Sequence, residues 1–290
     1  MLYFVVNLIF KFSYILFRKV VISMFAEAGK YKPCGIFTLG HFSLLAITVF
    51  GIYITLKNTI NKSKNDVHKI IKNVTIIAWT LEIIKIIFNI THNSLNKVNN
   101  YVPLYYCSIL LYAGLLSSFA KGNLKRVGDV TLATGTIIGG IAFLIYPSTS
   151  LPTYPVFHFI SLHSFFYHGM MIYIGILVNS TKYVVLKLSD VKYVSSLITV
   201  MSAFALIINN IFDANLMFIS KNFPGTPVAL IYKLTKGSFM FPVIMIFDQA
   251  FGPFFITYYC LKLLNKYITN YRSADNTSKK LPQKSYVGKC

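Results

Sequence analysis

The residues best suited to chemistry in this chain are a cysteine and three histidines that lie among long apolar stretches. Cys107 follows Pro103-Leu-Tyr-Tyr, and His158, His163 and His168 recur at intervals of five residues. A thiolate is a strong nucleophile, and an imidazole within hydrogen-bond reach can take the proton from its thiol. On a helix, His158 and His168 lie about 15 Å apart along the axis and about 80° apart around it, so they cannot bind one metal ion. The spacing favours one histidine as a general base over a three-histidine metal site.

Other polar side chains lie in the same apolar stretches, where an ionisable group at mid-membrane costs about 2.5–3.5 kcal/mol. Glu82 and Lys85 are three residues apart, so on a helix they share a face and can neutralise each other. Either they form a structural ion pair, or Glu82 orients an imidazole and Lys85 meets a lipid phosphate. A second polar cluster either lines a cavity or ends a helix at the membrane surface; it comprises Asn209, Asn210, Asp213 and Asn215.

The composition places all these residues in a membrane protein. Of 290 residues, 55% are hydrophobic and only 12% are charged, about half the charged fraction of a soluble domain. The 28 Lys and Arg against 8 Asp and Glu give a net charge of +20. These cations lie between apolar runs, as residues that flank membrane helices do. We therefore expect no nucleic acid partner, and the four cysteines show no metal-binding spacing.

A hydrocarbon core about 30 Å thick needs helices of about 20 apolar residues, and the sequence offers seven. The predicted fold class is all-α: a polytopic membrane bundle of about seven transmembrane helices plus an N-terminal amphipathic or interfacial helix. Pro103 suits a first helical turn, and Pro253 predicts a kink. The expected spans are 36–56, 70–90, 103–120, 127–146, 156–178, 194–212 and 241–264.

We expect one membrane domain, residues 36–265, with an N-terminal segment before it and a C-terminal tail after it. Residues 1–35 are predicted to be an interfacial helix and linker, with a tilted extra span as the alternative. Residues 266–290 are expected to form a basic, disordered tail. Lys and Arg concentrate in the loops after the first, third and fifth spans, which predicts a multi-pass protein of the cell membrane with a cytoplasmic C-terminus. Such loops also fit anionic lipid headgroups.

The order of these motifs resembles the YwaF-type integral membrane family over about residues 37 to 265. Two departures from the family's usual motifs bear on the substrate: Tyr105-Tyr106 replace His-Leu before the cysteine, and Asp213-Ala-Asn215-Leu-Met replaces Gly-Thr-Asn-Tyr-Met. The resemblance is carried by Phe-Thr-Leu-Gly-His41, Glu82-x-x-Lys85, Pro103-Leu-Tyr-Tyr-Cys107-Ser, His158, His168-Gly169, Asn210 and Asp213-Ala-Asn215-Leu-Met-Phe.

This family has eukaryotic relatives described as transmembrane acyltransferases that act on phospholipids. The resemblance implies Cys107 as the acyl acceptor and His168 as its base. The expected partners are membrane phospholipids or lysophospholipids, and we predict no cofactor and no metal. Tyr106, Asn210 or Asn215 would donate to the developing oxyanion. The full set of predicted substrate-binding or supporting residues is His41, Glu82, Lys85, Tyr106, His158, His163, Asn210, Asp213 and Asn215.

Two other functions are open at this point. A non-catalytic transporter or lipid-binding protein would use the polar residues to line an intramembrane cavity. A metal-dependent lipid hydrolase would need His41 or His92 beside the histidines of the 156–178 span. The acyltransferase requires Cys107 and His168 within hydrogen-bond reach.

Overall fold

The computed structural model describes residues 18, 21–92 and 98–278, with side chains up to residue 267. Every regular element in this part of the chain is helical, which confirms the predicted all-α polytopic bundle. Six helical segments are long and apolar enough to cross a membrane. They are α2 (Leu39–Thr59), α3 (Lys64–His92), α5 (Gly122–Ala133) continued by α6 (Gly135–Ile145), α7 (Phe159–Ser180), α8 (Val191–Phe212) and α10 (Met240–Ser278).

The third predicted span is shorter than the sequence suggested. It consists of η2 (Tyr106–Ser108) and α4 (Ile109–Phe119), and α4 is only about 16 Å long. The helix begins at Tyr106 rather than Pro103 because the Ser108 hydroxyl accepts a hydrogen bond from the Tyr105 amide at 3.3 Å and so caps the chain there. Cys107 therefore lies in the first turn of a helix that crosses only part of the bundle.

The fourth span is interrupted at Thr134, where the backbone leaves the helical region at φ −126° and ψ −69°. Such a break frees backbone carbonyls, which must find partners inside a membrane. The Ala133 carbonyl accepts a hydrogen bond from the Asn179 side chain of α7 at 2.7 Å. The Thr257 hydroxyl of α10 reaches the Thr134 carbonyl at 3.5 Å. Side chains of α7 and α10 thus provide hydrogen-bond donors for the carbonyls freed by the break.

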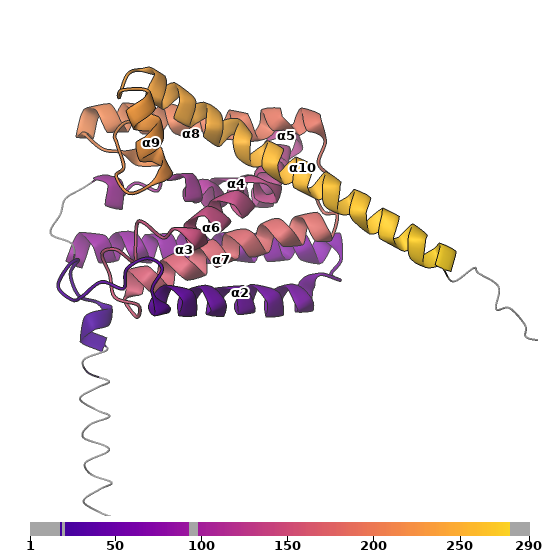
Figure 1. Cartoon of the computed structure of the whole chain (residues 1–290), viewed down its shortest axis with the longest axis horizontal. Helices are drawn as coiled ribbons and strands as arrows, with labels where there is room; N and C mark the ends of the chain where they lie inside the picture. The colour runs from indigo at the N-terminus through magenta and orange to yellow at the C-terminus, as the bar shows by residue number, and fades with distance from the viewer. Residues whose placement is uncertain (1–17, 19–20, 93–97, 279–290) are drawn as a thin grey trace, which may run out of the picture.

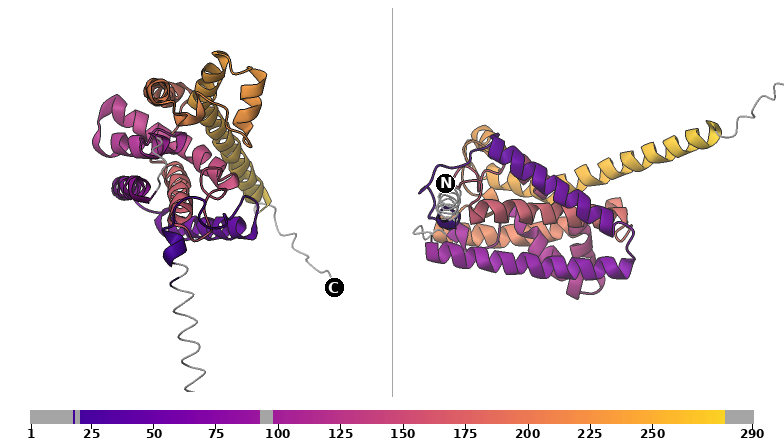
Figure 2. Two further views of the ribbon diagram at one scale, coloured as in Figure 1. Left: turned by 90° about the vertical axis from the view of Figure 1, so that its left-hand side faces the viewer. Right: turned by 90° about the horizontal axis from the view of Figure 1, so that it is seen from below.

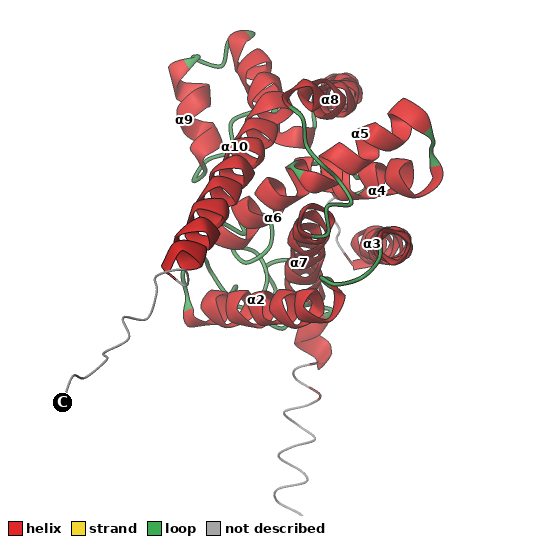
Figure 3. Cartoon of the chain, turned by 90° about the vertical axis from the view of Figure 1, so that its right-hand side faces the viewer, coloured by secondary structure: helices red, strands yellow, loops and turns green. Residues whose placement is uncertain are grey.

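Helix α7 lies at the centre of the bundle and is the most buried of the six spans. Figure 3 shows it end-on between α2, α3 and α6, and each of these helices packs against it. The helices α2, α3, α7 and α8 run in roughly the same direction across Figure 1, with α4 and α6 between them. The central helix therefore positions its histidines inside the protein rather than toward lipid.

Three connections between consecutive helices lie at the same end of the bundle (Figure 1). The turns follow α2, α4 and α7, and side chains connect the second and third of them to the start of α3. The Tyr183 hydroxyl contacts His68 Nδ1 at 3.1 Å and accepts a hydrogen bond from Lys125 at 2.8 Å. Arg126 forms an ion pair with the buried Asp190. This basic end is opposite the start of α7.

The two ends of the chain are described only in part. The predicted interfacial helix falls mostly on residues outside the described part, although residues 21–24 are helical. Helix α10 runs through Pro253 and continues to Ser278, where the sequence predicted a disordered tail from residue 266. Figure 2 shows this end of α10 directed away from the other helices.

Candidate functional site

A cavity of about 540 Å³ lies at the end of the bundle opposite the basic turns. Its walls come from α3, η2, α6, α7 and the segment leading into α9 (Pro227–Leu234), so it is built by residues far apart in the sequence. It brings together six of the predicted site residues: Glu82, Lys85, Tyr106, Cys107, His163 and His168. The other five do not line this cavity: His41, His158, Asn210, Asp213 and Asn215.

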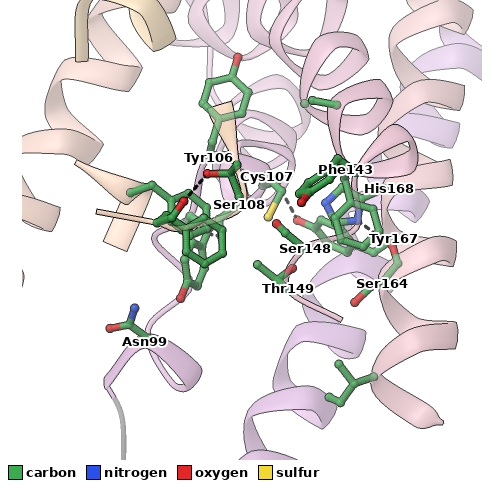
Figure 4. Close-up of a pocket in the computed structure, with 18 of the residues that line it drawn as sticks. Asn99, Tyr106, Cys107, Ser108, Phe143, Ser148, Thr149, Ser164, Tyr167 and His168 are labelled. Carbon is green, nitrogen blue, oxygen red and sulfur yellow. Dashed lines mark hydrogen bonds between the residues drawn. The ribbon is translucent and has the colours of Figure 1, made fainter. Parts of the chain in front are cut away.

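Cys107 is a free, half-buried cysteine at the N-terminal end of the η2–α4 helix. The peptide dipoles of a helix present partial positive charge at this end. The Tyr167 hydroxyl of α7 donates a hydrogen bond to the Cys107 carbonyl at 3.3 Å and ties the turn to the central helix. Figure 4 shows the sulfur atom beside Ser148, on the cavity wall. The thiol is thus accessible to a ligand in the cavity.

His168 is buried on α7 and held by two contacts. Its Nδ1 lies 2.7 Å from the Ser164 carbonyl oxygen, and its ring stacks on Phe143 of α6 with centroids 3.7 Å apart. A carbonyl only accepts hydrogen bonds, so Nδ1 carries the hydrogen, and in the neutral ring Nε2 is then an acceptor. The imidazole is therefore oriented so that Nε2, the nitrogen that can accept a proton, points away from the backbone of α7.

Cys107 and His168 share the cavity although 61 positions separate them in the sequence. Among the residues that the structure describes, the thiol and the imidazole make no direct hydrogen bond with each other. In Figure 4, the Tyr167 side chain lies between the two. Catalytic hydrogen bonds often close only when substrate is bound.

Glu82 and Lys85 form the predicted ion pair within α3. Lys85 Nζ lies 2.7 Å from Oε1 and 2.8 Å from Oε2 of the carboxylate. Both oxygens contact the lysine, and no hydrogen bond joins the carboxylate to a histidine in the described part of the chain. The Glu82 side chain is 5% exposed and that of Lys85 is 25% exposed. The pair therefore presents its cation to the cavity.

His163 lies one and a half turns before His168 on α7. Both ring nitrogens are buried and neither makes a hydrogen bond within the described part of the chain. The Leu81 carbonyl lies near the ring, without the geometry of a hydrogen bond. The ring stacks on Tyr167, with centroids 5.9 Å apart. Its contacts are those of a packed aromatic residue.

His41 and His158, predicted as substrate-binding or supporting residues, support the backbone instead. His41 Nε2 contacts the Leu144 carbonyl of α6 at 2.9 Å, and its Nδ1 accepts from the Phe37 amide at 3.1 Å. His158 caps α7, because its Nδ1 accepts from the Ile160 amide at 3.1 Å. Its Nε2 contacts the Ala26 carbonyl at 3.0 Å. Both rings have partners on either side and lie outside the cavity.

The polar cluster after α8 is a helix end and not a cavity wall. Asp213 adopts the left-handed conformation that ends α8, is exposed and pairs with Lys221 at 2.6 Å. Asn215 Oδ1 accepts from the Ser220 and Lys221 amides at 3.1 and 2.9 Å. Asn210 is exposed. These side chains fold the loop that carries Phe218 of η4 (Leu216–Phe218) to the cavity.

None of the three predicted oxyanion donors has its donor group directed at the Cys107 sulfur. Asn210 and Asn215 are outside the cavity. Tyr106 lines it, but its hydroxyl is buried near Gly135 of α6, where a Cβ atom would lie 3.1 Å away. Figure 4 shows this hydroxyl pointing away from the sulfur of Cys107.

Several residues that shape the site carry no signal in the sequence. Phe143 stacks on His168, and the hydroxyls of Ser148, Thr149 and Tyr167 lie on the same side of the cavity (Figure 4). The Ser164 carbonyl was predictable in principle, since it lies one helical turn before His168. The others come from different elements, and nothing in their spacing marks them.

The six long apolar helical segments in the described part of the chain define a multi-pass membrane protein. A model of the TMEM164 family matches residues 36–271, which is most of the chain, and the chain belongs to this family. Comparison with curated proteins and with solved structures found no match. The family match establishes a transmembrane family, and the YwaF-type relationship with its acyltransferase activity stays a prediction.

Proposed function

We propose that this protein is a membrane-embedded acyltransferase or transacylase that transfers a fatty acyl group from a phospholipid through a thioester on Cys107. The observation that supports this most is the shared cavity, which is lined by a free thiol at a helix N-terminus and by an oriented imidazole. The volume of about 540 Å³ is within the usual range of small-molecule sites.

In the first half-reaction, substrate binding brings the thiol and the imidazole into hydrogen-bond contact, and His168 Nε2 takes the proton from the Cys107 thiol. The thiolate attacks the carbonyl carbon of a phospholipid ester, and the oxygen becomes negatively charged in the tetrahedral intermediate. The Tyr167 hydroxyl is a nearby donor for this oxygen, in exchange for its hydrogen bond to the Cys107 carbonyl. The C–O bond then breaks, the imidazolium returns its proton to the leaving alkoxide, and a lysophospholipid departs.

In the second half-reaction, a lipid alcohol takes the place of the lysophospholipid. His168 removes the hydroxyl proton while the oxygen attacks the thioester, and the thiolate leaves and recovers the proton from the imidazolium. The aromatic wall that includes Phe143, Phe218 and Phe223 limits water in the cavity. Exclusion of water favours transfer to a lipid alcohol over hydrolysis.

The proposal extends to partners and location. The donors and acceptors are membrane phospholipids or lysophospholipids, and the basic turns bind anionic headgroups of the adjacent leaflet. The membrane is the cell membrane, with these turns and the C-terminus in the cytoplasm. The site then opens toward the outer leaflet.

Intact-protein mass spectrometry of the purified protein incubated with defined phospholipids tests this function. We expect a fatty-acyl adduct on the wild type that neutral hydroxylamine removes, and none on Cys107→Ala or His168→Ala. Cys34→Ala is the matched control, because Cys34 is also free and half-buried but lies outside the cavity. Unchanged lipids and no adduct with folded proteins would favour a non-catalytic lipid-binding or transport protein.

A further inference from the structure

Lys85 is the charged group in the cavity that the proposed chemistry does not use. It lies seven residues before the end of α3, which is about 10 Å along the helix. Its side chain is 25% exposed, against 5% for that of Glu82. The two carboxylate oxygens lie on one side of the ammonium group, which has three donor hydrogens. Its other side can donate to an acceptor in the cavity.

The walls around Lys85 make the cavity amphiphilic. Its polar side comes from α3 and from the η1 turn (Val98–Asn100), and it includes Asn89, Asn99 and Asn100. The opposite side is largely aromatic and aliphatic, with Phe143, Ile145, Phe218, Phe223, Pro227 and Val228. A ligand that fits both sides carries a polar or charged group at one end and an apolar chain at the other.

Lys85, Cys107 and His168 line the same cavity, so one ligand can contact all three. In a glycerophospholipid, the phosphate and the ester carbonyls are separated by only a few bonds of the glycerol. An anion held by Lys85 would therefore leave an ester within reach of Cys107.

We propose that Lys85 binds the phosphate group of a lipid in this cavity, and that Glu82 is a positioning residue that holds the ammonium toward it. The inference rests on the proposed function for the identity of the reacting ester. The binding itself requires no catalysis, because an ammonium donor and a phosphate acceptor form a charge-assisted hydrogen bond in any state of the thiol.

Three variants separate a phosphate ligand from a structural ion pair. Lys85→Met alone leaves the Glu82 carboxylate buried without a partner, so the central variant is the pair Glu82→Gln/Lys85→Met, which removes both charges. Lys85→Arg keeps the cation. Lys72→Met is the matched control, because Lys72 lies on the same helix, is exposed and contacts the Phe119 ring outside the cavity.

Binding is measured on full-length protein in the Cys107→Ala background, by displacement of a fluorescent fatty-acyl probe with dioleoylphosphatidic acid or dioleoylglycerol. We expect the background protein to prefer phosphatidic acid by about tenfold or more, the usual worth of a charged hydrogen bond. The pair variant should lose this preference, while Lys72→Met and Lys85→Arg keep it. A folded pair variant that retains the preference would overturn the inference.

A further arm distinguishes a lipid phosphate from a soluble one. Millimolar glycerol 3-phosphate should leave the fluorescent probe bound, and its displacement by this compound alone would assign the site to a soluble phosphate and overturn the lipid assignment. The thioester assay separates the two proposals. If no thioester forms but the pair variant loses its preference, the acyl transfer fails and the phosphate site stands. If the pair variant forms the thioester from a phospholipid at the wild-type rate, the phosphate site fails.

Discussion

Gly140 on α6 faces the backbone of α7 at the level of His168. A Cβ atom at this position would lie 2.9 Å from the His168 carbonyl oxygen and 2.6 Å from Cγ1 of Ile172. Ordinary contacts between such atoms are about 3.5–4.0 Å. Gly140→Ala must therefore separate α6 from α7 by about 1 Å or distort both helices. We expect it to lower the free energy of unfolding by about 1–3 kcal/mol, as overpacking does in other interiors.

The same change displaces the imidazole from its place beside Phe143. A misplacement of about 1 Å can cost about a hundredfold in rate, so we expect the rate of thioester formation to fall by that order. Gly51→Ala is the matched control, since Gly51 lies within α2 and a Cβ atom there would have nothing within 4 Å. It should unfold at the same temperature or higher, because alanine favours a helix by about 1 kcal/mol over glycine.

Thermal unfolding in detergent and the initial rate of adduct formation measure the two effects together. The reasoning is refuted if Gly140→Ala matches Gly51→Ala in both midpoint and rate. If Gly140→Ala lowers the unfolding midpoint but leaves the rate of adduct formation unchanged, only the claim that the spacing of α6 and α7 positions the His168 imidazole is refuted.

Three further substitutions test particular contacts. Arg126→Ala should cost about 3–5 kcal/mol of unfolding free energy, because it leaves Asp190 buried without its ion pair. The double variant Arg126→Met/Asp190→Asn, which removes both charges, should unfold at a higher temperature than Arg126→Ala. Equal unfolding midpoints for the two variants would contradict the role of the unpaired charge. Asn179→Ala removes the donor to the Ala133 carbonyl and should cost about 1–3 kcal/mol, measured in the same way; a neutral result would mean that another donor serves the break. Phe143→Leu should slow thioester formation more than it lowers the unfolding midpoint, because it removes the ring that stacks on His168; equal losses would indicate a packing role alone.

The apolar helices were predictable because the thickness of the membrane sets their length. Five of the seven expected spans correspond to long helices, and the 127–146 span corresponds to the α5–α6 pair. The short third helix was not predictable from hydropathy, because the run from Pro103 to Ala120 is apolar throughout and only the Ser108 hydrogen bond marks where the helix begins.

The sequence singled out two residues that share the cavity, but not the contacts that hold the site together. The order of the motifs singled out Cys107 and His168, and they share a cavity. The roles of His41 and His158 depend on carbonyls 103 and 132 residues away, which no local pattern reveals. In the same way, the direction of the Tyr106 hydroxyl is set by glycines of α6 that leave room for its ring.

The most direct test of the acyltransferase account is to locate the acyl group after incubation with a phospholipid that carries deuterated chains. The protein is digested without reducing agent, and the peptide that contains Cys107 is sequenced by mass spectrometry. The account predicts a deuterated acyl group on the Cys107 sulfur, which disappears when an acceptor lipid alcohol is added and reappears in that lipid. A deuterated acyl group on any other residue would contradict the account. The absence of any labelled peptide, with all lipids unchanged, would also contradict it.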